Sequence, residues 1–188
     1  RMQRRYKSKG GKWNDYVKRI KRNVAFLGIE RIVPHNERSQ SRSYSRLFKD
    51  AAEKGYEASI RDAVGYVLAK PYKNVRLLEH SKYVLPIVDT NGFTYSGFNM
   101  GAGENALFEI FSVIYSCGKG ALLVIDEIEL GLHAEAQRRL MSKLKEACLE
   151  TRTQIICTTH SKEIFDCLPY DARFFLEPVG GRTKITEG

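Results

Sequence analysis

Two adjacent carboxylates in the second half of the sequence could act on a phosphate ester bound to a metal ion. The pair Asp126-Glu127 directly follows the apolar run 121–125. A carboxylate held at a rigid strand end can orient Mg²⁺ through the water shell of the ion, because this ion keeps several waters and takes few protein ligands. A second carboxylate one residue further points in another direction, so Glu127 could align or deprotonate an attacking water. The same pair would also fit a strand that simply runs into a polar turn.

Alternating helices and strands position this pair. Apolar residues at helical spacing predict an amphipathic helix over 103–117, and Gly118-Lys119-Gly120 ends it. We expect a buried strand over 121–126, a helix over 134–150 and a second buried strand over 154–158. Two strands separated by a helix run parallel in one sheet.

The carboxyl ends of these two strands therefore meet at one edge of the sheet. Open parallel sheets bind their ligands at this edge. Asp126 and Glu127 follow the first strand, and His160 follows the second. The sequence predicts that all three side chains share one site.

The sequence around these residues resembles the ABC-type ATPase superfamily, and within it the soluble branch of chromosome-maintenance (SMC), recombination-repair and OLD-type proteins. Gly101-Ala102-Gly103-Glu104 is similar to the small-x-Gly-Glu signature that opens a helix in that branch. The resemblance implies that Gly101, Ala102, Gly103 and Glu104 direct a helix N-terminus and backbone N–H groups at a γ-phosphate. In the family the signature of one subunit faces the nucleotide of another, which implies a head-to-tail dimer of two copies of the domain.

Two further segments carry the same resemblance, which covers about residues 93–177. The string Glu127-Ile128-Glu129-Leu130-Gly131-Leu132-His133 resembles the segment whose last part, with Gly131 and His133, is the D-loop at the dimer interface. Thr158-Thr159-His160-Ser161 resembles the switch-histidine loop, which implies that His160 senses the γ-phosphate and positions the water. The resemblance thus implies ATP and Mg²⁺ as cofactors, with Asp126 as the metal residue and Glu127 and His160 as catalytic residues.

One part of such a site is missing from the sequence. An ABC-type site needs a phosphate-binding loop of the form G-x-x-x-x-G-K-[ST], the Walker A loop, and no such string occurs. Gly11-Lys12 is followed by Trp13, and Gly118-Lys119 is followed by Gly120, so neither fits. Because the chain starts at Arg1 without an evident natural start, we expect the loop to lie upstream in a longer protein. The alternative is that this polypeptide does not bind nucleotide by itself.

These patterns predict the α/β class with parallel strands, flanking helices and a basic N-terminal arm. The resemblance implies that the core is an incomplete P-loop NTPase core of the ABC type. The first half should contain a buried strand over 24–29, a loop over 35–45 and a helix over 47–69. Two strands should follow at 74–78 and 83–88, and a hairpin should close the chain over 171–186. We divide the chain into the arm, 1–22, and the ATPase domain, 23–188.

The arm carries the whole formal charge of +9, with ten Lys or Arg and one acid in residues 1–22. It could contact the phosphate backbone of nucleic acid, with Tyr6, Trp13 and Tyr16 available for stacking, or it could be a solvated charged segment. No apolar run is long enough for a membrane helix, so we expect no membrane partner. The four cysteines, Cys117, Cys148, Cys157 and Cys167, form no C-x-x-C pair, which favours a reducing, cytoplasmic setting.

The leading hypothesis is an ATP-hydrolysing domain that dimerises when it binds ATP and separates after hydrolysis. The resulting mechanical change would be passed to DNA, RNA or an associated effector nuclease. By resemblance, phage defence is a possible setting. The first alternative is a non-catalytic nucleic-acid-binding or scaffolding module on a degenerate ATPase fold. The second is a transporter ATPase, although Gly103-Glu104 and Ile128 stand where transporters carry an L-S-G-G-Q-like signature and a proline. A Glu127→Gln exchange discriminates the catalytic from the non-catalytic hypothesis.

Overall fold

The computed structural model describes residues 6–7, 13–14, 22–38, 43–80 and 83–188, with side chains from Arg22 onward. Within the arm, β1 (Tyr6–Lys7) and β2 (Trp13–Asn14) pair antiparallel. The rest of the arm apart from Arg22, and the stacking and phosphate contacts expected of it, lie outside the described residues. None of the helices formed by the described residues is long and apolar enough to cross a membrane.

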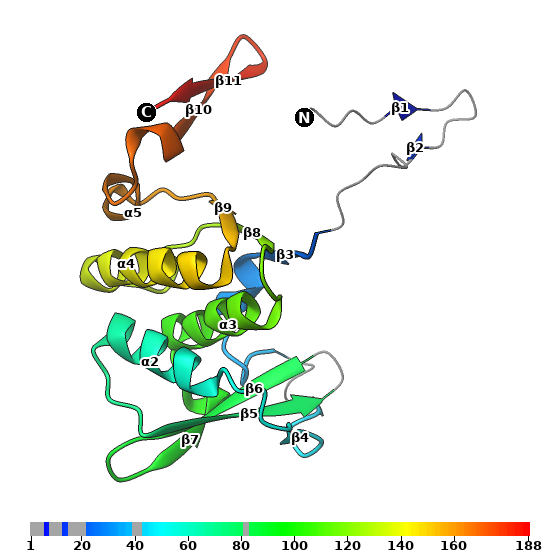
Figure 1. Ribbon diagram of the computed structural model, residues 1–188, viewed down its shortest axis with the longest axis vertical. Helices are drawn as coiled ribbons and strands as arrows, with labels where there is room; N and C mark the ends of the chain where they lie inside the picture. The colour runs from blue at the N-terminus through cyan, green and yellow to red at the C-terminus, as the bar shows by residue number, and fades with distance from the viewer. Residues whose placement is uncertain (1–5, 8–12, 15–21, 39–42, 81–82) are drawn as a thin grey trace.

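A three-stranded parallel sheet carries the predicted site. Its strands are β3 (Val24–Leu27), β8 (Leu122–Ile125) and β9 (Gln154–Cys157), in the order β3-β8-β9. The helices α3 (Ala102–Ser116) and α4 (Ala134–Thr151) connect into and between these strands and cover one face of the sheet (Figure 1). The predicted α/β class, the two helices and the parallel pairing of β8 with β9 are confirmed.

The opposite face of this sheet is open, which differs from the expectation that its strands are buried. Phe26, Val124 and Ile156 are neighbours in register on that face, and Phe26 and Ile156 are 68% and 61% exposed. The other face holds Leu123 and Ile125, which are buried under the helices. Apolar content alone predicted strands that were buried on both sides, but only one side has a covering layer among the described residues.

A second sheet lies on the far side of the helices. It is antiparallel, in the order β4-β5-β6-β7, with β4 at Lys49–Asp50, β5 at Asn74–His80, β6 at Tyr83–Asp89 and β7 at Thr94–Ser96. The helix α2 (Glu57–Leu68) packs between it and the pair α3 and α4 (Figure 1). The two predicted strands at 74–78 and 83–88 are confirmed, and β7 follows them.

The helix expected over 47–69 is wrong in its first half. Residues 51–56 form no helix, and α2 begins only at Glu57. Gly55 has a φ of +81°, outside the helical region, and the Glu57 carboxylate accepts a hydrogen bond from the backbone N–H of Lys54 at 2.8 Å. The glycine and this local hydrogen bond start the helix later than the spacing of apolar residues predicts.

One hydrophobic core joins the layers. It contains residues from all three long helices, from the inner face of the parallel sheet and from the second sheet, among them Val64, Val88, Phe111, Leu123, Ile125, Leu140 and Ile164. Short 3₁₀ helices lead into it at η1 (Ile29–Ile32) and η2 (Gly97–Asn99). The core therefore fixes α3 and β8 relative to each other, and with them the motifs at their ends.

The hairpin at the end of the chain stands apart from this core. The short helix α5 (Lys162–Asp166) and the turn η3 (Tyr170–Ala172) lead to the antiparallel pair β10 (Phe174–Val179) and β11 (Arg182–Glu187). This pair confirms the predicted hairpin. It projects away from the helical layers (Figure 1), and every residue of both strands is exposed.

Candidate active site

The acidic pair lies where β8 ends, in a turn with an unusual backbone. Glu127 has a φ of +47°, in the left-handed region that a residue with a side chain seldom adopts. The hydroxyl of Thr158, at the end of β9, donates to Asp126 Oδ1 at 2.6 Å and accepts from the Glu127 N–H at 2.8 Å. The Thr158 carbonyl accepts from the Ile128 N–H at 3.1 Å. We call residues 126–128 the acidic turn.

Asp126 fits a magnesium ion held through water. Its carboxylate is half-buried, and its Oδ2 atom has no hydrogen-bond partner among the described residues. No cluster of three or more His, Cys, Asp or Glu side chains suited to a metal occurs in the described part of the chain. A single carboxylate at a strand end matches an ion that retains most of its waters and takes its other ligands from phosphates.

The structure brings His160 to the acidic turn. Its Nε2 atom lies 3.8 Å from Glu127 Oε1, and its side chain is 86% exposed. Only the backbone of His160 is held: its N–H donates to Glu129 Oε1 at 2.7 Å, while the neighbouring Thr159 hydroxyl donates to Glu129 Oε2 at 2.6 Å. The imidazole is therefore free to turn, whereas the loop that carries it is fixed.

Glu129 and Arg31 belong to this site, although neither was predicted from the sequence. Glu129 ties the histidine loop to the segment after β8 through two hydrogen bonds. Arg31, in η1, donates from Nη1 to the Asp126 carbonyl at 2.6 Å and from Nη2 to the Glu127 carbonyl. The spacing of Glu129 from Glu127 could have drawn attention to it, but an arginine after a short strand offers no comparable signal.

The signature residues split into two groups. Gly101 is exposed and Ala102 is half-buried at the start of α3. Gly103 is buried, and a β-carbon on it would lie 2.2 Å from the Gly131 carbonyl oxygen. Within this chain, Gly103 thus allows the start of α3 to pack backbone to backbone on the segment after the acidic turn.

Glu104 points into its own chain. Its side chain is 11% exposed, and Oε1 accepts hydrogen bonds from the Tyr95 hydroxyl at 2.6 Å, from Lys70 Nζ at 3.0 Å and from the Tyr72 hydroxyl. Burial and the Glu104 carboxylate raise the pKa of Tyr72. Burial alone would lower the pKa of Lys70, but its hydrogen bonds to Tyr95 and Glu104 outweigh this and raise it. The carboxylate anchors α3 to the second sheet.

The two residues expected in the D-loop have local roles in the structure. Gly131 adopts a φ of +79° and packs against the backbone of Gly103. His133 is the N-cap of α4, and its Nδ1 atom accepts a hydrogen bond from the Ala136 N–H at 3.3 Å. Both residues shape the exposed turn that connects the acidic turn to α4.

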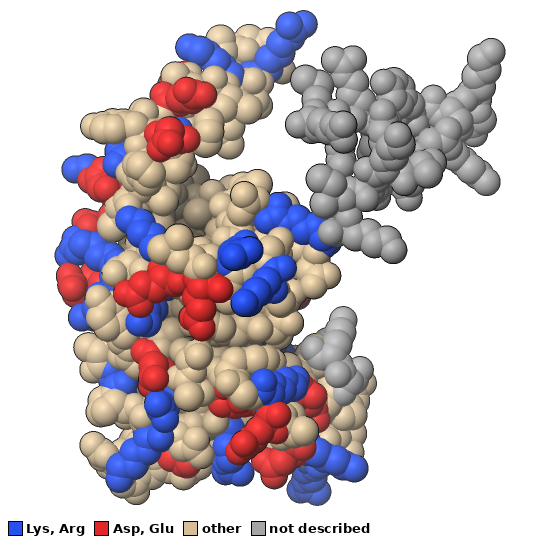
Figure 2. All heavy atoms as spheres, viewed as in Figure 1, with Lys and Arg blue, Asp and Glu red and all other residues tan. Residues whose placement is uncertain are grey.

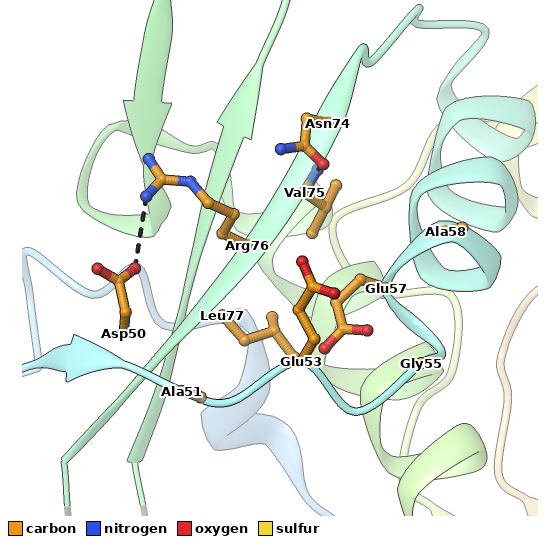
Figure 3. Close-up of a pocket in the computed structure, with 10 residues that line it drawn as sticks. All are labelled: Asp50, Ala51, Glu53, Gly55, Glu57, Ala58, Asn74, Val75, Arg76 and Leu77. Carbon is orange, nitrogen blue, oxygen red and sulfur yellow. Dashed lines mark hydrogen bonds and ion pairs between the residues drawn. The ribbon is translucent and has the colours of Figure 1, made fainter.

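A cavity of about 500 Å³ lies elsewhere, between β4, β5 and the start of α2. Glu53 and Glu57 both line it (Figure 3), and Arg76 forms an ion pair with Asp50 at 3.4 Å. None of the residues at the acidic turn, the histidine loop or the start of α3 lines it. The catalytic candidates instead lie at the carboxyl edge of the parallel sheet.

Comparison with known protein families gave a match over most of the chain. A model of the family described as "AAA domain, putative AbiEii toxin, Type IV TA system" matches residues 14–166. Comparison with curated proteins found no significant match.

Solved structures show the same fold. The SMC head domain from Thermotoga maritima is 16% identical with a TM-score of 0.55, and the match covers 87% of this chain and 53% of that one. A head bound to the C-winged helix domain of ScpA is also 16% identical, with a TM-score of 0.56 and coverage of 84% and 49%. A third structure, described as ATP-driven dimerization and DNA stimulated activation of SMC ATPases, is 15% identical with a TM-score of 0.54 and coverage of 71% and 83%. The chain thus spans about half of the two head domains.

Proposed function

The chain belongs to the family described as "AAA domain, putative AbiEii toxin, Type IV TA system", and we propose that it supplies the hydrolytic side of an ATPase site. It is an SMC-like ATPase domain by family and fold. One observation carries the proposal: Glu127 and His160 face each other across 3.8 Å beside Asp126, at the carboxyl edge of a parallel sheet. In the proposed role, Glu127 takes a proton from the attacking water.

The other residues have supporting roles in this proposal. Asp126 would hold Mg²⁺ through water, and the ion would neutralise charge on the transferred phosphate. The exposed imidazole of His160 would turn to meet the γ-phosphate. Thr158 and Glu129 would keep these groups in place, since each links the end of β9 to the segment after β8.

The test is Glu127→Gln in the complete protein that carries this chain. We expect ATP turnover to fall at least about 100-fold, because general-base catalysis contributes about 10²–10⁴-fold, while ATP affinity stays within about threefold. Glu146→Gln, on the exposed side of α4, is the matched control and should leave both unchanged. Unchanged turnover in Glu127→Gln would show that the catalytic assignment is wrong.

A phosphate-binding loop from outside this sequence would complete the site. Two features support this part of the proposal. β9 pairs with β8 on one side only among the described strands, so its other edge offers free N–H and C=O groups. Phe26 and Ile156 leave one face of the parallel sheet open, although such sheets are normally covered on both faces.

The hairpin adds to this support. A two-stranded hairpin is marginally stable by itself, yet β10 and β11 expose Phe174, Leu176 and Ile185 to solvent. In Figure 2 the surface is hollowed between this hairpin and the body of the molecule. We propose that the strand and helix around the phosphate-binding loop occupy this region. Tight ATP binding by residues 1–188 alone would contradict this.

The second copy of the domain is the proposed partner. Gly101 and Ala102 are accessible at the start of α3, where backbone N–H groups could meet the γ-phosphate bound to the other copy in a head-to-tail dimer. The ATP-bound Glu127→Gln protein should therefore be dimeric by light scattering, whereas the nucleotide-free protein should be monomeric. A monomer at saturating ATP would exclude the shared site.

We further propose that the protein works in the cytoplasm and couples ATP turnover to a change in bound DNA or RNA, or in an associated effector nuclease. Phage defence is one setting for this activity. The charge of +9 in residues 1–22 supports a nucleic-acid contact, and Figure 2 shows basic and acidic side chains interspersed over one face of the body. The second candidate, a non-catalytic nucleic-acid-binding module, is favoured by the missing phosphate-binding loop. Charge reversal at Arg4, Arg5, Lys18 and Arg19 should weaken DNA or RNA binding and flatten its salt dependence.

A further inference from the structure

We infer that Arg31 is a positioning residue that sets the backbone of the acidic turn, and through it the direction of the Glu127 carboxylate. The inference rests on the proposed ATPase function for its catalytic consequence. The structural part, that Arg31 holds the turn in its left-handed conformation, rests on contacts alone.

Arg31 is buried directly beneath the turn. Its side chain lies in η1, immediately after β3, and the residue is 1% exposed. Nη1 donates to the Gly28 carbonyl at 2.9 Å and to the Asp126 carbonyl at 2.6 Å, and Nη2 donates to the Glu127 carbonyl. A guanidinium is planar and presents its donors in a fixed arrangement, so this one group ties the end of β3 to two successive carbonyls of the turn.

A buried arginine without an ion pair requires a reason. Arg31 forms no salt bridge with any described residue, and its Nε atom has no hydrogen-bond partner there. Burial lowers the pKa of Arg31, against the opposing effect of Glu109 and the carboxylates around the turn. Burying a charge is unfavourable unless polar groups compensate it, and here the compensating groups are the carbonyls of Gly28, Asp126 and Glu127. An apolar side chain could fill the same space, but it could not hold these carbonyls.

The turn is constrained from two sides. A left-handed backbone at a residue with a side chain persists only where its surroundings determine it. Arg31 binds the carbonyls of Asp126 and Glu127 from the β3 side, and Thr158 binds the N–H of Glu127 from the β9 side. Because the φ of Glu127 decides where its carboxylate points, loss of either constraint would let the carboxylate leave the position facing His160.

Arg31 is itself held by its neighbours. Arg38 Nη2 donates to the Arg31 carbonyl at 3.0 Å and forms an ion pair of 3.3 Å with Glu109 on α3. The position of Arg31 is thus coupled to the helix that begins with the signature. Replacing Arg31 should disturb the turn, while the Asp126 carboxylate keeps its bond to Thr158.

The experiment compares Arg31→Lys and Arg31→Met in the complete protein. We expect kcat to fall at least tenfold in Arg31→Met and less in Arg31→Lys, with KM and ATP affinity within threefold in both. Hydrogen exchange at the amides of Glu127 and Ile128 should quicken at least tenfold in Arg31→Met. The matched control is Arg139→Met, since Arg139 on α4 donates to the Val67 carbonyl on α2, away from the acidic turn, and should affect neither measurement.

The outcomes separate this inference from the proposed function. Full kcat in Arg31→Met, with Glu127→Gln inactive, overturns the inference and leaves the ATPase proposal standing. If Glu127→Gln keeps its turnover, the ATPase proposal fails, and unchanged exchange at Glu127 and Ile128 in the Arg31 variants then overturns the inference as well. Should Arg31→Met not fold, Arg31→Lys decides: parallel losses of thermal midpoint, ATP affinity and kcat would indicate a merely structural role and overturn it.

Discussion

The start of α3 and the carboxyl edge of the parallel sheet use their motif residues in opposite ways. At the start of α3, Gly103 packs on Gly131 and the Glu104 carboxylate is enclosed by Lys70, Tyr72 and Tyr95. At the sheet edge, the His160 imidazole is 86% exposed and lies 3.8 Å from the Glu127 carboxylate. The residues at the helix therefore determine shape, and those at the edge remain available for chemistry. Substitutions at the first region should cost stability, and substitutions at the second should cost turnover.

The largest effect is expected at Gly103. In Gly103→Ala the new β-carbon would lie 2.2 Å from the Gly131 carbonyl oxygen. This oxygen belongs to the backbone and cannot rotate away as the end of a side chain could. We expect a loss of about 3 kcal/mol in the free energy of unfolding, measured by chemical denaturation. The matched control is Gly101→Ala, where a β-carbon would meet nothing within 4 Å and the change should be under about 0.5 kcal/mol. Equal effects at the two glycines would contradict the packing role.

The next effect concerns pH and the loop before α3. His35 is buried beside Gly97 and Phe98, and burial, with a smaller contribution from Arg38, lowers its pKa to about 4 from an ordinary 6.5. Between these values the unfolded chain binds the proton and the folded one does not. The contribution of His35 to the free energy of unfolding is therefore fully present above pH 6.5. As the pH falls toward 4, the free energy of unfolding decreases by about 2–3 kcal/mol.

The check on His35 is a difference between two pH profiles. Denaturation of the protein and of His35→Gln should be compared from pH 7 to pH 4, so that the carboxylates contribute equally to both. The free energy of unfolding should fall less steeply with falling pH in His35→Gln than in the unaltered protein. Parallel profiles would show that the imidazole titrates normally in the folded protein.

A smaller loss is expected from Glu104→Gln. The change leaves Lys70 without its carboxylate and weakens the hydrogen bonds from Tyr72 and Tyr95, so the free energy of unfolding should fall by about 1–2 kcal/mol. Glu135→Gln, an exposed ion-pair residue in the first turn of α4, serves as the control with little effect. A variant of full stability with weakened ATP-dependent dimerisation would instead indicate that Glu104 contacts the nucleotide of the partner copy.

The smallest stability effect, with a clear effect on rate, should come from His160→Ala. The imidazole makes no hydrogen bond within the described chain and is 86% exposed, so unfolding should change by less than about 0.5 kcal/mol. Turnover should fall about tenfold, equivalent to about 1.4 kcal/mol of transition-state stabilisation. A loss of stability without a loss of turnover would reverse the contrast between the two regions.

Local patterns predicted the elements that carry the motifs. The helices at 102–116 and 134–151 and the strands around them follow the spacing of apolar residues, because helical periodicity depends on neighbours only three or four positions apart. The same information predicted that Asp126, Glu127 and His160 share an edge, since parallel strands end together. It failed at 47–56, where Gly55 and the Lys54–Glu57 hydrogen bond delay the helix.

Other features were decided only by the tertiary structure. Arg31 meets Glu127 across 96 positions and Lys70 meets Glu104 across 34, and no local pattern marks either pair. The open face of the parallel sheet could not be predicted from the sequence either. A strand of apolar residues has the same sequence pattern whether one or both of its faces are covered. The sequence by itself thus determined which residues could carry out the chemistry, and the packing of distant segments determined which of them are held, which are enclosed and which remain free.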